Sequence, residues 1–151
     1  FNRKAFEEVL DTVAEVYRLG EREDAYLVIL DLDGLKQVND THGHQAGDRL
    51  LHLFATTLAG HFKREARVYR LGGDEFAVLF HGPEINENTP FGDRLRRVTA
   101  DVRRSEFPAA GASFGCARLS ETGGDTSEWF ETADRRMYAR KKARPDPKKL
   151  V

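Results

Sequence analysis

The sequence lacks several features that would assign it to common classes of protein. Only one of its 151 residues is cysteine, Cys116, so no disulfide can form within the chain and nothing indicates an oxidising compartment. No uninterrupted apolar run approaches the roughly 20 residues that a membrane-spanning helix needs, and no signal peptide is visible. Lys and Arg number 24 against 25 Asp and Glu, and the net charge of −1 gives no general attraction to nucleic acid or to an anionic membrane. A phosphate ligand would therefore need local groups to bind it.

The length and an apolar content of 40% fit one domain over residues 1–151 with one hydrophobic core. The chain starts at Phe1 rather than Met, so we expect it to be the C-terminal catalytic part of a longer protein. We expect the domain itself to be cytoplasmic, although the parent protein could be anchored in a membrane.

Hydrophobic periodicity predicts an alternation of helices and strands. Helices are expected over 2–19, 47–62, 93–105 and 126–143, with a short helix or loop over 34–45. Strands are expected from residue 25, on both sides of a turn within 68–80, and over 109–120, with a loop at 81–93. This order is typical of an α/β (α+β) fold, in which a mixed sheet carries helices on one face.

Acidic residues gather at two predicted strand ends. Asp31 and Asp33 close the first strand, and Asp74 and Glu75 follow Gly72-Gly73 in the turn of "VYRLGGDEFAVLF". If the strands are neighbours, Asp31 and Asp74 converge, and such a pair repels unless a cation lies between its members. Magnesium prefers oxygen ligands and completes its shell with substrate phosphates. Each half alone has a simpler interpretation, an ordinary hairpin and a solvated strand end.

The segment between these acids contains residues that suit a guanine base. Asp48 can accept from the N1 and N2 donors of guanine, and the amide of Asn39 can meet its O6 or N3 edge. Taken alone, Asp48 fits an acid in the first turn of a helix, and Asn39 fits a turn former. His42 and His44 have no third partner for zinc.

Together these motifs resemble the GGDEF-domain family, the diguanylate cyclases. The resemblance rests on "DLDGLKQVNDTHGHQAGDRLL" followed by "RLGGDEF", with support from "FNRKAFEEVLD", "ASFGCA" and "ADRRMYARKKA". It covers nearly the whole chain. It implies a mainly antiparallel central sheet flanked by helices, similar to the nucleotide-cyclase and polymerase-palm folds, with a ferredoxin-like core.

The resemblance also implies roles for individual residues. Asp31, the main-chain carbonyl of Leu32, and Asp74 would bind magnesium, or manganese in its place, with Asp74 assisting deprotonation and Glu75 supporting the metal site. The substrate-binding set would be Lys36, Asn39, His44, Asp48, Gly72, Gly73 and Lys141. The implied reaction condenses two GTP into cyclic di-GMP and two pyrophosphates. Because each domain would hold one GTP, a homodimer is required, and an upstream sensory or regulatory domain would control it.

The sequence departs from the family pattern at two places. Pro145 occupies the position of a second phosphate-binding arginine, for which Arg140 or Arg144 would have to substitute. The Arg-x-x-Asp motif of product inhibition is replaced by Lys63 to Ala66, which predicts that feedback binding at this site is lost. The alternative function is a catalytically weak domain that binds GTP and regulates a neighbour.

Overall fold

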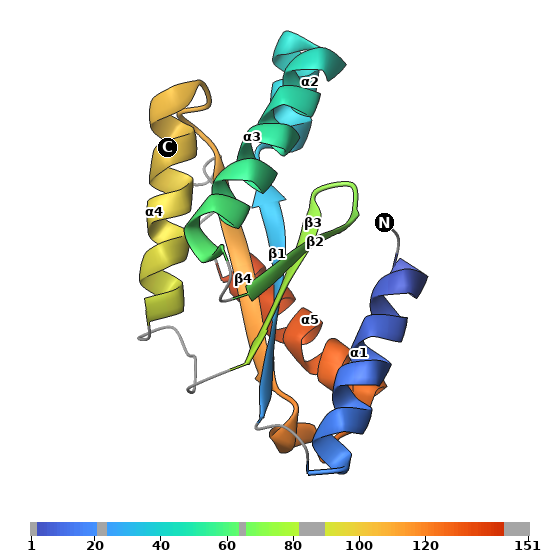
Figure 1. Cartoon of the computed structure of the whole chain (residues 1–151). Coiled ribbons are helices and arrows are strands. Elements are labelled where there is room, and N and C mark those ends of the chain that lie inside the picture. Colours follow the sequence, from blue (N-terminus) through green and yellow to red (C-terminus); the bar gives the residue numbers. More distant parts are fainter. Residues whose placement is uncertain (1–2, 21–23, 64–65, 82–89, 144–151) are drawn as a thin grey trace.

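The computed structural model describes residues 3–20, 24–63, 66–81 and 90–143 (Figure 1). In chain order the elements are α1 (Arg3–Arg18), β1 (Ala25–Asp33), α2 (Leu35–His42), α3 (His44–Phe62), β2 (Ala66–Gly72), β3 (Glu75–His81), α4 (Pro90–Ser105), β4 (Gly111–Arg118), a short 3-10 turn (Ser120–Thr122) and α5 (Thr126–Lys142).

The four described strands form one sheet in the order β2-β3-β1-β4, and every pairing is antiparallel. The expected antiparallel sheet is thus confirmed, with β1 in a central position. In this register Asp31 lies opposite Glu75 of β3 on one side and opposite Ser113 of β4 on the other. Both expected acid clusters therefore come to the same end of the sheet.

Helices cover both faces of the sheet, so the expectation of helices on one face was wrong. Leu30 and Phe114 belong to an apolar cluster formed with α3 and α4, whereas Leu27 and Ile29 belong to a second cluster formed with α1 and α5. Figure 1 shows these two helix layers on either side of the sheet. The continuous apolar run of β1 has this cause, because a strand with both faces covered has no solvent side to make polar.

Two glycines explain the helix boundaries near residue 43. Gly34 (φ 90°) precedes α2 and Gly43 (φ 89°) separates α2 from α3, and both have the positive φ that glycine tolerates best. The region expected as a short helix or loop is therefore a helix, and α3 begins three residues before the predicted start. At α4, Pro90 is the first helical residue, a position where its missing N–H costs no hydrogen bond.

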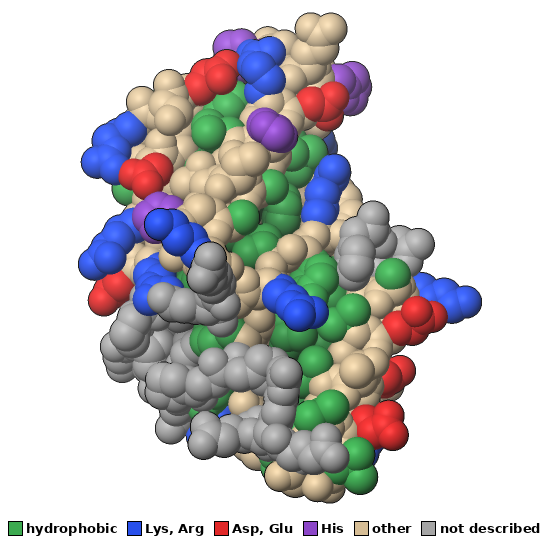
Figure 2. Space-filling model, viewed as in Figure 1, with side chains coloured by type: hydrophobic (Ala, Val, Ile, Leu, Met, Phe, Trp, Pro, Cys, Tyr) green, Lys and Arg blue, Asp and Glu red, His purple; other side chains and the backbone are tan. Residues whose placement is uncertain are grey.

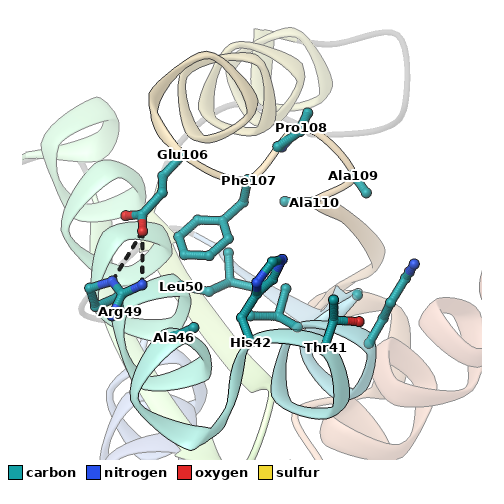
Figure 3. A pocket seen from close by; sticks show the side chains of 13 residues that line it. Thr41, His42, Ala46, Arg49, Leu50, Glu106, Phe107, Pro108, Ala109 and Ala110 are labelled. Carbon is teal, nitrogen blue, oxygen red and sulfur yellow. Dashed lines mark hydrogen bonds and ion pairs between the residues drawn. The ribbon is translucent and has the colours of Figure 1, made fainter.

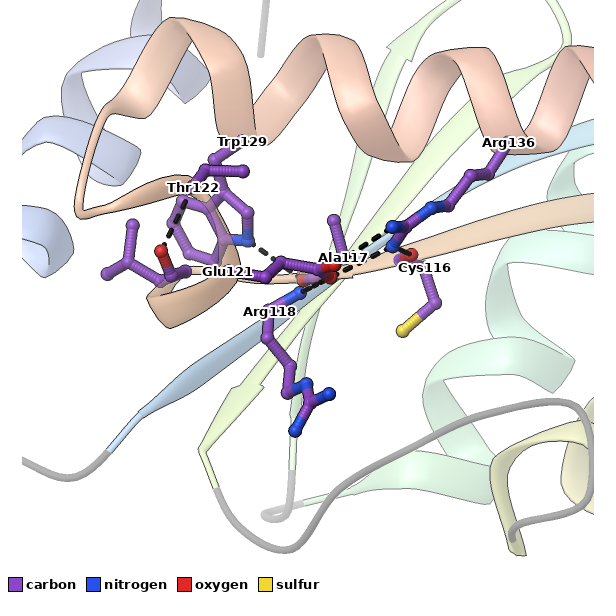
Figure 4. Close-up of polar contacts among 8 residues, drawn as sticks. Cys116, Ala117, Arg118, Glu121, Thr122, Trp129 and Arg136 are labelled. Carbon is purple, nitrogen blue, oxygen red and sulfur yellow. Dashed lines mark hydrogen bonds and ion pairs between the residues drawn. The ribbon is translucent and has the colours of Figure 1, made fainter.

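Helix α5 is fixed to β4 by buried and polar contacts (Figure 4). The indole of Trp129 donates a 2.8 Å hydrogen bond to the Ala117 carbonyl. The guanidinium of Arg136 donates to the Cys116 carbonyl and forms a two-pronged ion pair with Glu121, all at 2.8 Å. At Gly115, an added Cβ would lie 2.1 Å from the α5 backbone nitrogen of Met137, so only glycine permits this approach. We call the contacts of Glu121, Arg136 and Trp129 with β4 the α5 clamp.

Basic and acidic side chains are interspersed over α3 and α4 on the face shown in Figure 2, where they do not form a field of one sign. Arg49 of α3 pairs with Glu106 at 3.0 Å, and His61 pairs with Asp101 at 2.9 Å. This pattern agrees with the balanced composition. Among the described helices, none has the length and apolarity needed to cross a bilayer.

Candidate active site

The turn between β2 and β3 brings Asp74 to the end of β1. The Leu32 N–H donates a 2.8 Å hydrogen bond to the Asp74 carbonyl, which fixes the turn against the strand that carries Asp31. The two carboxyl groups lie close enough for the negative charge of Asp31 to act on Asp74. The convergence of Asp31 and Asp74 was expected only if their strands were neighbours, and the structure satisfies that condition.

The local environment makes the charged form of Asp74 costly. Burial raises its pKa above the ordinary value, and the nearby charge of Asp31 raises it further, while Lys141 acts in the opposite direction. When both are ionised, Asp31 and Asp74 can only accept hydrogen bonds, so they cannot bond to each other. A hydrogen bond between them requires that one of the two carboxyl groups is protonated. A bound cation would remove the same repulsion without a proton.

Lys141, near the end of α5, provides the positive charge that the structure places beside Asp31. Its ammonium nitrogen lies 2.6 Å from Oδ2 of Asp31, and the Asp31 side chain is only 13% exposed. The hydrogen bond to Asp31 raises the pKa of Lys141, which therefore remains charged at neutral pH. The other carboxylate oxygen, Oδ1 of Asp31, is buried and has no hydrogen-bond partner among the described residues.

The acid pair fits a magnesium ion. The described residues include no group of three or more His, Cys, Asp or Glu side chains that could hold a metal ion by themselves. Magnesium does not require one, because it usually takes one or two carboxylates and fills the remaining positions with water and phosphate oxygens. The orphaned Oδ1 shows that Lys141 alone does not satisfy the Asp31 carboxylate, and the raised pKa of Asp74 shows that a nearby cation would stabilise its charged form.

Glu75 faces a partner that the sequence reasoning missed, Asp134 of α5. Burial and the charge of Asp134 raise the pKa of Glu75 to about 7, with a hydrogen bond to Asp134 and the charge of Asp31 adding to the effect. Helical periodicity could have indicated this residue, because Asp134 lies seven positions before Lys141 and therefore on the same face of α5.

The Gly-Gly pair shapes the turn through its backbone. Gly72 has φ 145° and Gly73 has φ 50°, and a β-bulge lies between Arg70 and Gly72. The Arg70 side chain donates two hydrogen bonds, of 3.2 and 2.9 Å, to the Gly73 carbonyl. A Cβ added at either glycine would meet no atom within 4 Å, so the space around the turn is open. The hairpin interpretation is therefore confirmed, and the role of this turn in a site stays a prediction.

Asn39 of α2 packs against the first turns of α3, the helix that carries Asp48. A Cβ added at Gly47 would lie 1.7 Å from Oδ1 of Asn39, so the amide packs directly against the residue that precedes Asp48. Asp48 is exposed. Lys36 and His44 are also exposed, on α2 and at the start of α3. Their contact with a nucleotide stays a prediction.

A cavity of about 480 Å³ lies elsewhere, between α2, α3 and the segment after α4 (Figure 3). Figure 3 shows the ring of Phe107 between the Arg49–Glu106 pair and the Ala110 segment. Gly34 lines the cavity, but the predicted site residues Asn39, Asp48, Asp31, Asp74 and Glu75 do not. The candidate active site is therefore not this cavity but the end of the sheet that carries Asp31, Asp74 and Glu75, which we call the acidic end.

Two expectations fall partly outside the described residues. Arg144 and Pro145 lie beyond residue 143, and residues 64–65 of the Lys63–Ala66 window are not described either. Within the described part, Arg140 packs its guanidinium 4.1 Å from the ring centre of Phe114.

An antiparallel four-stranded sheet with two carboxylates and a Gly-Gly turn at one end defines a nucleotide-cyclase type of fold. The chain belongs to the GGDEF domain family, since the family model described as "Diguanylate cyclase, GGDEF domain" matches residues 1–146.

Relatives agree with this assignment. An uncharacterized protein in the hutH 5′ region of Streptomyces griseus is 37% identical over 97% of this chain and 61% of its own length. The diguanylate cyclase DgcS of Shewanella oneidensis is 33% identical over 76% of this chain and 38% of its own length. The chain thus spans less than two thirds of the length of each of these two relatives. Among solved structures, the coiled coil and GGDEF domain of DgcB from Caulobacter crescentus, in complex with c-di-GMP, is similar with a TM-score of 0.77, 29% identity, and coverage of 93% of this chain and 76% of that one.

Proposed function

We propose that this chain is a diguanylate cyclase domain that condenses two GTP molecules into cyclic di-GMP and two pyrophosphates. The observation that carries the proposal is the convergence of Asp31 and Asp74 beside Lys141 at the end of the sheet. Family membership supports the same reaction. Magnesium, or manganese, would be bound by Asp31, Asp74 and the Leu32 carbonyl, where it would supply charge neutralisation and an acidified hydroxyl.

The residues of the chain would perform the remaining tasks. Asp74 assists removal of the proton from the attacking 3′-hydroxyl, and Glu75 supports the site from β3. The bond that forms joins this oxygen to the α-phosphorus of the other GTP, and the bond that breaks releases pyrophosphate. Asn39 and Asp48 read the guanine edge, while Lys36, His44 and the main chain around Gly72 and Gly73 contact the nucleotide.

Lys141 would exchange partners when the nucleotide binds. With no nucleotide its ammonium neutralises Asp31 at 2.6 Å. With Asp31 and Asp74 holding a metal ion, the Lys141 ammonium would be free to bind the substrate phosphates. This exchange makes Lys141 both a substitute for the cation and a substrate-binding residue.

Two identical domains must meet face to face, because each would hold one GTP. We therefore propose a homodimer on the cytoplasmic side, controlled by an upstream domain. In the product-inhibition motif, Lys63 stands at the arginine position and Ala66 at the aspartate position, so we propose that feedback at that site is absent.

The test is to fuse the chain to a dimerising coiled coil, incubate it with GTP and magnesium, and identify the nucleotides by mass spectrometry. Detection of cyclic di-GMP would support the proposed diguanylate cyclase activity. GTP that is bound but not converted would support the alternative, a regulatory GTP-binding module. The reason to consider this alternative is that Pro145 stands where the family has a phosphate-binding arginine.

A further inference from the structure

Two buried side-chain oxygen atoms have no hydrogen-bond partner among the described residues, and both lie at the acidic end of the sheet. They are Oδ1 of Asp31 and Oγ of Ser113. Ser113 is completely buried. An unpaired buried hydroxyl or carboxylate oxygen is destabilising, so each such atom in a folded protein calls for an explanation.

The two atoms belong to directly opposed residues. Asp31 of β1 and Ser113 of β4 are partners in the antiparallel register, so their Cβ atoms are expected about 4.5–5.5 Å apart. Both side chains point to the α5 face, because their neighbours Leu30 and Phe114 belong to the cluster on the opposite face. One atom is an acceptor without a donor, and the other is a hydroxyl that can donate.

The ion pair with Lys141 explains why the two atoms are not yet joined. The ammonium holds Oδ2 of Asp31 at 2.6 Å and thereby fixes the orientation of the carboxylate. If Lys141 is released to a phosphate, the carboxylate is free to rotate toward Ser113. A carboxylate that binds a metal through one oxygen is normally hydrogen-bonded through the other.

We propose that Ser113 is a positioning residue, whose hydroxyl donates to Oδ1 of Asp31 and directs Oδ2 toward the metal ion. The inference rests on the proposed function, because it takes Asp31 as a metal ligand. The simpler interpretation is that Ser113, like Gly115, is small because α5 packs closely on β4. That interpretation requires a small side chain and gives no role to the hydroxyl.

The test measures metal binding directly, by titrating Mn²⁺ into the whole chain with a non-hydrolysable GTP analogue and counting free Mn²⁺ by electron paramagnetic resonance. Ser113→Ala is expected to weaken Mn²⁺ binding about 10-fold or more. Its melting temperature without metal should be unchanged or higher, because the change removes an unpaired buried hydroxyl. This combination of weaker metal binding and undiminished stability is not expected from a packing role.

Two further variants separate the hydroxyl from the volume it occupies. Ser113→Cys keeps the size but is a poor donor, and it should behave like Ser113→Ala. Ser113→Thr keeps the donor and should bind Mn²⁺ within about 3-fold of the unaltered chain. The matched control is Thr122→Val, which removes a buried hydroxyl bonded to the Leu119 carbonyl, outside the site, and should leave Mn²⁺ affinity unchanged.

Unchanged Mn²⁺ affinity in both Ser113→Ala and Ser113→Cys would overturn the inference. So would a loss of affinity matched by an equal loss of melting temperature in both variants. Asp31→Ala distinguishes this failure from that of the proposed function. If Asp31→Ala binds Mn²⁺ normally, the metal assignment itself is wrong. If Asp31→Ala loses Mn²⁺ binding while Ser113→Ala binds Mn²⁺ normally, only the role of Ser113 is rejected.

Discussion

Two carboxylate–cation pairs that involve helix α5 differ in how completely their polar atoms are satisfied. In the α5 clamp, Arg136 holds both oxygens of Glu121 at 2.8 Å and also bonds the Cys116 carbonyl. The guanidinium lowers the pKa of Glu121 below its ordinary value. At the acidic end of the sheet, Lys141 holds one oxygen of Asp31 and the other oxygen has no partner. Nearby, Asp74 and Glu75 have raised pKa values.

The difference separates structure from function. A pair whose hydrogen bonds are complete and whose carboxylate is stabilised as an anion has no further ligand to accept. A pair with an unpaired acceptor, next to carboxyls that resist ionisation, is improved by an additional cation. The α5 clamp therefore positions the helix, and we propose that the Asp31–Lys141 pair is the one that changes partners during function.

The largest expected effect comes from removing a carboxylate at the acidic end. Asp74→Ala should lower turnover of GTP by about 10³-fold or more, because a metal ligand and a proton acceptor are both lost. Product formation by the forced dimer is measured by liquid chromatography. Asp93→Ala, which removes an exposed acid of α4, is the control. Activity within 10-fold of the unaltered dimer in Asp74→Ala would reject its assigned role.

A second change should alter specificity. Asp48→Ala removes the acceptor assigned to the N1 and N2 donors of guanine, so the preference for GTP over ATP should fall by about 10–100-fold. Competition binding with the two nucleotides measures this preference. Asp40→Ala on α2 is the matched exposed acid. If selectivity survives in Asp48→Ala, guanine is read by other residues.

The α5 clamp should respond in the opposite way. Arg136→Met should reduce the free energy of unfolding by about 1–2 kcal/mol, since charge-assisted hydrogen bonds to Glu121 are lost at a partly exposed site. Urea denaturation measures the loss. Turnover per folded molecule should remain near that of the unaltered dimer. A fall in turnover with no change in stability would contradict the distinction between the two pairs.

The raised pKa of Glu75 predicts that the stability of the metal-free chain depends on pH. Its pKa is about 7 in the folded protein against an ordinary 4.5, so the folded chain retains a proton that the unfolded chain releases. As the pH rises from 4.5 to about 7, the free energy of unfolding should therefore fall. The expected loss is about 1 kcal/mol, because solvent screens the charge of this half-exposed group. Glu75→Gln, measured with chelator present, should flatten this part of the profile. An equally steep profile in Glu75→Gln would assign the titration to another group.

Much of this arrangement could be predicted from the sequence. The strand that ends at Asp31 and the turn that carries Asp74 are marked by local chemistry, an apolar run and a Gly-Gly pair. The unbroken apolar run also indicates that both faces of β1 are buried. The prediction of helices on only one face did not take this into account. Asp134 and Ser113 were missed for another reason. Their relevance comes from contacts between elements. The spacing from Lys141 could have indicated the face of α5 that carries Asp134, but no local pattern specifies that Ser113 lies opposite Asp31.

The most direct test is a crystal of the chain with Mn²⁺ and a non-hydrolysable GTP analogue, with the metal located by anomalous scattering. We predict a manganese peak within bonding distance of Asp31 and Asp74, with the Lys141 ammonium moved from Oδ2 of Asp31 to a phosphate oxygen. A peak away from these carboxylates, or Lys141 still paired with Asp31 beside bound nucleotide, would contradict the account.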